Sequence, residues 1–471
     1  MRLGALTGGD EPGRVTGFAI DHRKVAPGTI FGAFRGARFN GEDYIADAVR
    51  AGAIAVVARP EATVTGAVHV SATEPRQEFA RLAARFFQPF PETVVAVTGT
   101  NGKTSNVELV RQLWRMAGRP SASIGTLGVT TSDDQVTTGL TTPDIVTFLS
   151  NMAGLERMGI SHAAFEASSH GLSQYRTEGL EVAAAAFTNF SRDHLDYHET
   201  MHAYFEAKMR LFDEVVKPDG TAVIWMDDPK SAEVLARCRA RGLATITVGA
   251  QGETLKLLKR ETTPMGQKLT IDYGGKTKIV ALGLIGAYQA SNALTAAGLV
   301  IATGGETEAT LANLGRVHPV RGRLERAVIG RAGAPVYVDY AHTPDAIEAA
   351  CLALRPHTKE RLIIVFGAGG DRDQGKRAEM GAVAARLADL SIVTDDNPRS
   401  EDPAAIRAAI LTGAPGAREI AGRREAIRAA MREAGPGDVI LLAGKGHEQG
   451  QIVGDKVLPF DDVTVAREEA A

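Results

Sequence analysis

A chain of 471 residues is too long for a single hydrophobic core, so its length predicts two or three domains. A net charge of −3, with 44% hydrophobic and 23% charged residues, excludes a disordered or strongly basic chain, and the composition favours neither a nucleic acid nor an acidic membrane as partner. Two cysteines are too few for a disulfide framework or a cysteine metal site, and no apolar run approaches the roughly 20 residues that span a bilayer. We therefore expect a monomeric cytoplasmic protein, not inserted in a membrane, that acts on small molecules.

Predicted strands and helices alternate along the chain, which indicates an α/β fold. In residues 1–89, short apolar runs predict strands, and the prolines at 89 and 91 end the last helix of a small α/β domain. In residues 90–319, continuous apolar runs at 163–167, 182–187 and 221–225 predict a buried parallel sheet. Alternation between residues 253 and 284 predicts an antiparallel excursion from it.

Residues 320–471 contain regularly spaced apolar runs, separated by alanine-rich helical segments. They predict strands at 336–338, 362–366, 391–394 and 439–442. This pattern is typical of a doubly wound, Rossmann-like domain. We therefore expect three domains, with boundaries after residues 89 and 319 and a P-loop-type parallel sheet in the central one.

A phosphate-binding loop is predicted where the apolar run 94–97 ends and a helix begins. Its residues are Gly99, Thr100, Asn101, Gly102, Lys103, Thr104 and Ser105. Glycines let backbone N–H groups approach phosphate, while Lys103 can reach a terminal phosphate and Thr104 can ligate Mg²⁺. The loop is two residues shorter than the common G-x-x-x-x-G-K-[S/T] spacing, and the alternative is a glycine turn with a surface lysine. The strand before it and the helix after it favour ATP.

Polar side chains follow two further strands of the predicted central sheet. Glu166 ends the run 163–165, and His194 follows the strand that ends at Phe187. Ligands of open α/β sheets bind outside the carboxyl ends of the strands, so both residues should face the phosphate loop. A carboxylate and an imidazole beside a triphosphate suit a divalent cation, and oxygen-rich ligands favour Mg²⁺. Taken alone, His194 could equally be a hydrogen-bonding loop histidine.

The helix predicted over 200–212 carries a lysine on its apolar face. Lys208 lies three and four positions after Phe205 and Tyr204, which belong to that apolar stripe. One reading is a long side chain whose ammonium reaches the domain edge. The other is a functional lysine whose pKa is lowered by burial, leaving a nucleophilic amine. Periodicity alone leaves both open.

Three loops at strand ends of the last domain share one predicted edge of its sheet. They contain Arg372, the run Asp396-Asn397-Pro398-Arg399, and Gly444 with Glu448. Arginine can hold a carboxylate in a bidentate fork, and Glu448 can pair with an ammonium. A ligand with both groups, such as an amino acid, fits these loops.

Several motifs together form a specific pattern. They are Gly99-Thr-Asn-Gly-Lys-Thr104, Thr141-Thr-Pro143, Glu166-Ala-Ser-Ser-His-Gly171, Ser191-Arg-Asp-His-Leu-Asp-Tyr-His198, the Lys208 helix, Asp339-Tyr-Ala-His-Thr-Pro-Asp345, Gly370-Asp-Arg-Asp-Gln-Gly-Lys-Arg377, Asp396-Asn-Pro-Arg399 and Gly444-Lys-Gly-His-Glu448. On these motifs the chain resembles the Mur ligases over nearly its whole length. The resemblance implies three domains, for a UDP-sugar, for ATP and for an incoming amino acid.

The resemblance also implies roles for individual residues. Lys208 matches a carbamylated lysine that, with Thr104, Glu166 and His194, would serve Mg²⁺, and Lys103, Glu166, His194 and Lys208 would be the catalytic set. Positions for the UDP-muramoyl-dipeptide match Ile20, His22, Thr141, Thr142, Ser168, Gln174 and Arg176. The chain departs from many relatives at His22, where they carry Ser, and at Leu140, where some carry Asn, and the binding stretch Ala37-Arg38-Phe39 varies in the family. Asn292, Arg323 and Asp339 match residues serving ATP. Arg372, Asp396, Asn397, Pro398, Arg399, Gly444 and Glu448 match the diaminopimelate contacts.

The activity implied by the resemblance is ATP-dependent addition of meso-diaminopimelate to UDP-N-acetylmuramoyl-L-alanyl-D-glutamate through an acyl phosphate, in peptidoglycan precursor synthesis. Three alternatives stay open. The amino acid could be L-lysine; the chain could be a folylpolyglutamate synthetase, which leaves the loop 396–399 unexplained; or it could be a noncatalytic module with ATP as a structural ligand.

Overall fold

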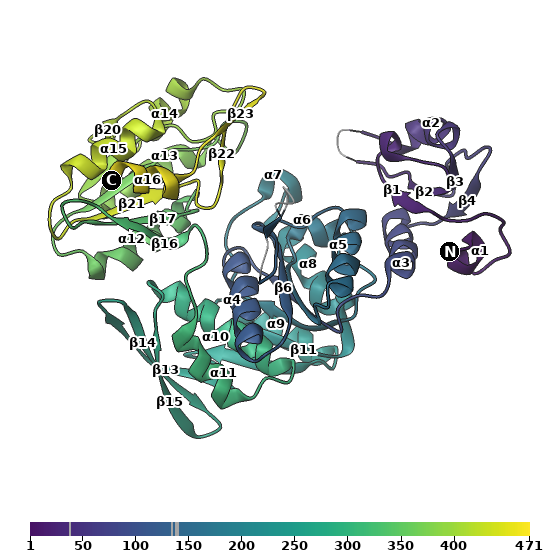
Figure 1. The fold of residues 1–471 in the computed structure, drawn as a ribbon, viewed down its shortest axis with the longest axis horizontal. Helices are drawn as coiled ribbons and strands as arrows, with labels where there is room; N and C mark the ends of the chain where they lie inside the picture. Colours follow the sequence, from purple (N-terminus) through teal and green to yellow (C-terminus); the bar gives the residue numbers. More distant parts are fainter. Residues whose placement is uncertain (37–38, 133–134, 137–140) are drawn as a thin grey trace. The chain divides into compact units, whose positions relative to one another are not determined.

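The computed structural model describes residues 1–36, 39–132, 135–136 and 141–471. These residues form two compact units, Met1–Leu255 with Thr295–Thr310, and Lys256–Leu294 with Leu311–Ala471. Each unit is a mixed α/β structure with parallel strands (Figure 1), which confirms the predicted fold class. The two boundaries between the three expected domains remain a prediction. Within the described residues, no helix combines the length and apolar character needed to cross a membrane.

The first unit begins with a small parallel sheet in the order β1-β2-β3-β4. Its elements are α1 Leu3–Thr7, β1 Gly17–Ala19, β2 Thr29–Gly32, α2 Ile45–Arg50, β3 Ala53–Ala58, β4 Val68–Ser71 and α3 Pro75–Phe87. Phe79 of α3 packs edge-on against Phe18 of β1, with ring centroids 5.2 Å apart. The helix α3 ends at Phe87, where the prolines predict its end.

A larger sheet follows in the same unit. Its elements are β5 Thr93–Thr98, α4 Lys103–Met116, β6 Ser121–Gly125, β7 Gly128–Thr130, β8 Gln135–Val136, α5 Ile145–Arg157, β9 His162–Glu166, α6 Ser169–Ser173, β10 Val182–Phe187, α7 Leu195–His198, α8 Met201–Arg210, β11 Val216–Trp225, α9 Ser231–Ala240 and β12 Ala244–Gly249. The order β12-β11-β10-β5-β9-β6 is parallel, and β7 and β8 add antiparallel strands. The strand β5 therefore lies between β10 and β9.

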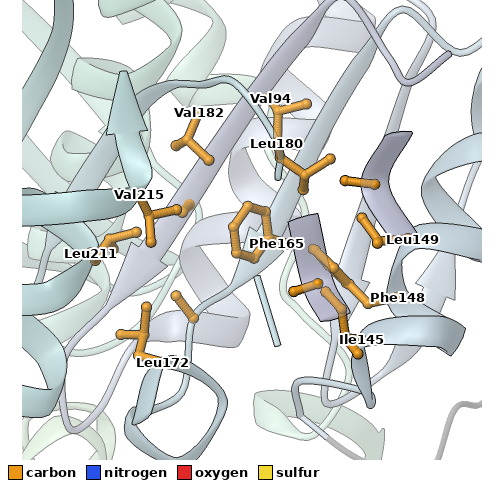
Figure 2. Close-up of a cluster of buried hydrophobic side chains, with 14 of the residues drawn as sticks. Val94, Ile145, Phe148, Leu149, Phe165, Leu172, Leu180, Val182, Leu211 and Val215 are labelled. Atoms are coloured by element: carbon orange, nitrogen blue, oxygen red, sulfur yellow. The ribbon is translucent and has the colours of Figure 1, made fainter. Parts of the chain in front are cut away.

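The core of this unit explains why its central strands are continuous apolar runs. Side chains of β5, β9 and β10 are buried together with those of the helices that cover the sheet. Figure 2 shows Phe165 of β9 in the middle of this cluster, and its ring meets the ring of Phe148 from α5 at 5.0 Å. This packing fixes the strand ends, from which the functional loops leave.

Two segments differ from the sequence expectation. The strand β11 begins at Val216, five residues before the apolar run 221–225 from which it was predicted. The added residues include Pro218, Asp219 and Gly220, which lie in a bulge, because Val182 pairs with Val216 while Ala184 pairs with Thr221. The helix predicted over 200–212 ends as an α-helix at Arg210 and continues as a π-helix, Leu211–Val215.

The second unit contains an antiparallel ribbon and a doubly wound sheet (Figure 1). Elements from residue 255 onward are β13 Leu255–Thr263, β14 Gly266–Tyr273, β15 Lys276–Leu282, α10 Ala287–Ala302, α11 Thr307–Asn313, β16 Arg323–Ile329, β17 Pro335–Asp339, α12 Pro344–Leu354, β18 Leu362–Phe366, α13 Lys376–Leu387, β19 Leu390–Val393, α14 Pro403–Leu411, β20 Arg418–Glu419, α15 Arg423–Glu433, β21 Val439–Ala443, β22 Gly450–Val453, β23 Lys456–Pro459 and α16 Asp462–Ala470. The pairs β13–β14 and β14–β15 are antiparallel, which confirms the predicted excursion.

The doubly wound sheet has the order β16-β17-β21-β18-β19-β20, parallel except for β16. Separate apolar clusters bury its two faces, which is the reason its strands are apolar throughout. The loops after β21, β18 and β19 consequently leave from neighbouring strands at one edge.

Candidate active site

The phosphate loop connects β5 to α4. Gly99 has φ +144° and Gly102 has φ +87°, conformations that favour glycine. A Cβ on Gly99 would also lie 1.9 Å from Oγ1 of Thr188, so the loop admits no side chain there. The Lys103 ammonium donates hydrogen bonds to the carbonyls of Gly99 and Thr100, at 2.9 and 2.7 Å. Thr104 and Ser105 are buried in the first turn of α4, whose N-terminus attracts anions.

The loop after β10 braces the phosphate loop. The backbone N–H of Thr100 donates to the backbone carbonyl of Asn189 at 2.9 Å, and the backbone N–H of Asn101 donates to Oδ1 of Asn189 at 2.8 Å. The backbone N–H of Ser191 donates to Oγ1 of Thr100, at 3.0 Å. The neighbouring position of β10 and β5 in the sheet thus brings together two segments that lie about ninety residues apart in the sequence.

Lys208 is buried, with 1% of its surface exposed. Its Nζ donates to the Gly99 carbonyl at 2.7 Å, the same oxygen that accepts from Lys103, and lies 4.4 Å from the ring centroid of Tyr204. Burial, and next the nearby Lys103 ammonium, lowers the pKa of the Lys208 amine well below its ordinary value. Of the two readings of this lysine, the structure excludes the one in which its ammonium reaches the domain edge.

Tyr204 is a residue of this site that sequence reasoning treated only as part of an apolar stripe. Its ring is buried, its hydroxyl donates to Oγ1 of Thr100 at 3.3 Å, and burial raises its pKa. The ring also meets that of His194, edge to face, at 5.9 Å. His194 itself has φ +53° and a half-exposed side chain.

Glu166 ends β9, next to β5, and is buried. Its Oε1 accepts from the backbone N–H of Thr126 at 2.7 Å and its Oε2 from the Thr126 hydroxyl at 3.1 Å. The oxygen of the same hydroxyl lies 3.1 Å from Oγ1 of Thr141, within hydrogen-bond distance. Thr126 was missed from the sequence, because a threonine in a short turn carries no motif of its own.

The predicted substrate residues after β9 form one hydrogen-bonded cluster. Oγ1 of Thr142 donates to the Glu166 carbonyl at 2.8 Å and lies 2.9 Å from Oγ of Ser168. Arg176 donates to the Thr142 carbonyl at 2.9 Å and to Oε1 of Gln174 at 2.7 Å. Burial lowers the pKa of the Arg176 guanidinium. An anionic ligand would relieve this cost, because it would offset the desolvated charge.

Ile20 directly follows β1 of the small sheet at the start of the chain, and His22 begins the 3-10 helix His22–Lys24. The His22 ring stacks on that of Tyr44, with centroids 4.3 Å apart, and Ile20 is 38% exposed. In the part of the chain that the structure describes, no hydrogen bond or ring contact joins either residue to the cluster around Thr142. Ala37, Arg38 and Leu140 lie outside the described residues.

In the second unit, Asp339 is buried at the end of β17, and its Oδ2 accepts from the backbone N–H of Leu324 at 2.7 Å. Burial raises its pKa to about 6, against the lowering effect of Arg323. The Arg323 guanidinium lies 4.9 Å from the ring centroid of Tyr340. Asn292 is buried on α10 and donates to Oε1 of Gln289 at 3.1 Å.

The loops after β18, β19 and β21 hold one another. The backbone N–H of Gly370 donates to the Asn397 carbonyl at 2.9 Å, and Arg399, with φ +53°, donates to the Gly370 carbonyl at 2.8 Å. A Cβ on Gly444, whose φ is +115°, would lie 2.5 Å from Oδ2 of Asp396. Asn397 donates to Oε2 of Glu448 at 2.7 Å. The three loops thus form one structure.

Arg372, Pro398 and Lys445 in these loops differ from one another in burial and contacts. The Arg372 side chain is exposed, and no hydrogen bond of the described residues ties it to the other loops. The backbone of Pro398 lies against Gly370, on which a Cβ would be only 1.9 Å from the Pro398 carbonyl oxygen. Lys445, by contrast, is completely buried among these loops and was read from the sequence only as part of a polar turn.

No group of three His, Cys, Asp or Glu side chains among the described residues is arranged to hold a metal ion. Thr104 and Glu166 nevertheless offer oxygen donors, the kind that Mg²⁺ prefers. A complete coordination shell at these residues would therefore need further oxygens, from nucleotide phosphates or from a modified side chain.

Three family models match the chain. They are the Mur ligase family catalytic domain at residues 14–109, the Mur ligase middle domain at 97–300, and the Mur ligase glutamate ligase domain at 322–446. The UDP-N-acetylmuramoyl-L-alanyl-D-glutamate--2,6-diaminopimelate ligase of Zymomonas mobilis is 60% identical over 96% of this chain and 94% of its own length. The enzyme of that name from Bradyrhizobium diazoefficiens is 50% identical, over 98% and 97%.

Solved structures agree with these matches. A UDP-N-acetylmuramoyl-L-alanyl-D-glutamate--2,6-diaminopimelate ligase superposes with a TM-score of 0.73 at 31% identity, covering 100% of this chain and 98% of that one. The MurF ligase of Thermotoga maritima in complex with ADP, at 19% identity and a TM-score of 0.64 over 97% of each chain, shares the fold.

Proposed function

The chain belongs to the Mur ligase family, and we propose that it joins an amine of meso-2,6-diaminopimelate to UDP-N-acetylmuramoyl-L-alanyl-D-glutamate in peptidoglycan precursor synthesis. As a member of that family it is an ATP-dependent peptide ligase that forms ADP. One observation carries the choice of substrates: relatives similar over nearly the whole chain bear the name of this reaction. Because ATP and UDP-linked sugars are cytoplasmic metabolites, we place the reaction in the cytoplasm.

The phosphate loop supplies the phosphoryl-donor half of the site. The γ-carboxylate of D-glutamate attacks the γ-phosphate of ATP, giving an acyl phosphate and ADP. The Lys103 ammonium, held by carbonyls of its own loop, has to turn toward the phosphates to neutralise the charge that develops on them. The amine of diaminopimelate then attacks the acyl carbon, and phosphate leaves.

Lys208 is proposed to be carbamylated. Carbamylation joins carbon dioxide to a neutral amine and releases a proton, and burial beside Lys103 favours the neutral form of Lys208. The product is an anionic carbamate, which would place an oxygen ligand beside the phosphate loop. With Thr104, Glu166 and His194 it would hold Mg²⁺, which supplies charge neutralisation on the transferring phosphoryl group. The oxygens that the unmodified residues lack would come from the carbamate and from ATP.

The remaining residues are proposed to position the substrates. The cluster of Thr142, Ser168 and Arg176 would take the muramoyl-dipeptide, since Arg176 presents a desolvated guanidinium to an anionic substrate. Asn292, Arg323 and Asp339 would serve ATP. The loops after β18, β19 and β21 would bind diaminopimelate, with Arg399 on a carboxylate and Glu448 on an ammonium.

The test is a reaction of the purified chain with all three substrates. We expect phosphate release that requires both UDP-N-acetylmuramoyl-L-alanyl-D-glutamate and meso-diaminopimelate, and a product whose mass is that of the UDP-muramoyl-tripeptide. Phosphate release with folate and glutamate instead would favour the folylpolyglutamate alternative, and equal kinetics with L-lysine would overturn the choice of amino acid. No phosphate release with any combination would overturn the ligase assignment.

A further inference from the structure

Lys445 is a buried lysine in the turn that follows β21. It is 0% exposed, and its Nζ donates to Oδ1 of Asn397 and to Oε2 of Glu448, both at 3.1 Å. Lysine is almost never fully buried unless it is paired. Both partners of this ammonium belong to the loops proposed to bind diaminopimelate, one after β19 and one after β21.

The Asn397 carboxamide is fixed in one orientation by this contact. Its Oδ1 accepts from Lys445 and from the backbone N–H of Ile452, at 2.9 Å, and its Nδ2 donates to Oε2 of Glu448 at 2.7 Å. If the carboxamide were rotated by 180°, its NH₂ group would face two hydrogen-bond donors and would lose its partners. The free energy lost in that way favours the observed orientation. Lys445 therefore also decides which atom Asn397 presents to Glu448.

Only one carboxylate oxygen of Glu448 therefore accepts hydrogen bonds from these side chains. Its Oε2 accepts both internal donors, Lys445 and Asn397, whereas no described residue donates to Oε1. The side chain is 30% exposed, so it can be reached from outside the protein. The carboxylate is held by one oxygen and offers the other.

We propose that Lys445 is a positioning residue that aligns Glu448 so that Oε1 receives an ammonium group of the incoming amino acid. The inference rests on the proposed function, in which these loops bind diaminopimelate. An ammonium held by a carboxylate stays protonated and is no nucleophile, so the group at Oε1 is the amine that does not react. Without Lys445, Glu448 can rotate and offer either oxygen, and part of the bound orientation is lost.

The test is Lys445→Met, which keeps the length of the side chain and removes the ammonium. The matched control is Lys456→Met, a change of the same type at an exposed position that begins β23. We expect KM for meso-diaminopimelate to rise about 10- to 100-fold in Lys445→Met, the range for loss of a hydrogen bond to a charged group. KM for ATP and for the UDP-linked substrate should stay at the level of the control.

A second substrate separates positioning from a merely structural role. The compound 2-aminopimelate lacks the amine that would sit at Glu448, so it should have a raised KM with the unchanged protein. The penalty for 2-aminopimelate relative to diaminopimelate should shrink in Lys445→Met, because Glu448 is no longer aligned. An equal penalty in both proteins, or a parallel loss for all three substrates with a lowered melting temperature, overturns the inference.

Lys445→Gln provides the same comparison if Lys445→Met does not fold, since glutamine keeps a donor in the loop but carries no charge. Failure of the proposed function gives a different result, because the unchanged protein would then form no product with diaminopimelate at all.

Discussion

The pair Arg423–Asp462 provides a sharp test of how the last sheet is held together. Arg423 begins α15 and Asp462 begins α16; both are 0% exposed and form a bidentate pair at 2.7 and 2.6 Å. Arg423 also donates to the Ala443 carbonyl at 3.0 Å, directly before the turn that contains Lys445. Asp462→Asn removes the anion and leaves a guanidinium buried without its counter-charge. Breaking a buried pair in this way costs about 3–5 kcal/mol.

The control is Glu348→Gln, which breaks an ion pair of the same kind on the surface. Glu348 lies 3.0 Å from Arg386, and their side chains are 39% and 57% exposed, so its loss costs about 0–1 kcal/mol. Thermal unfolding followed by circular dichroism should show a melting temperature that is lower by on the order of 10 °C in Asp462→Asn and nearly unchanged in the control. Replacing both partners, as in Arg423→Met with Asp462→Leu, should recover much of the loss. Equal melting temperatures for Asp462→Asn and Glu348→Gln would refute the reasoning.

Three further outcomes test the proposed site. Arg399→Ala should raise KM for diaminopimelate about 10- to 100-fold and leave the Kd of ATP unchanged, since it removes a charged donor to a carboxylate; equal losses for both ligands would contradict this. KM for ATP should rise as the pH falls through about 6, where Asp339 becomes protonated in the folded chain and loses its charge, and Asp339→Asn should flatten that profile. With ¹³C-labelled bicarbonate, NMR should show a carbamate signal in the unchanged protein and none in Lys208→Met. The Lys208→Met variant should also be inactive, and full activity of that variant would exclude a role for the modification.

The sequence predicted best those features that depend on local periodicity. The strand expected over residues 182–187 is β10, and the spacing of Lys208 to Tyr204 and Phe205 placed it on the apolar face of its helix, while the structure alone showed that its ammonium is buried. Such features can be predicted without knowledge of the tertiary fold. A strand buried on both faces of a sheet, or the buried face of a helix, requires apolar residues at a regular spacing that is visible in the sequence.

The features that the sequence did not predict depend on partners far along the chain. The amine of Lys445 reaches Asn397, 48 residues away, and Arg423 pairs with Asp462 across 39 residues. A lysine between two glycines has the local pattern of a solvated turn, and only the neighbouring position of β21 and the loops after β18 and β19 buries it. The start of β11 was missed for a related reason, because its proline, aspartate and glycine are accommodated by a bulge against β10.

Thr126 carries a consequence for how this protein can vary. Its hydroxyl contacts Glu166 and Thr141, so one side chain joins a proposed metal ligand to a proposed substrate residue. A substitution that suits one of them disturbs the other, and neither can change without the threonine. Among homologous chains, positions 126, 141 and 166 should therefore covary as a set.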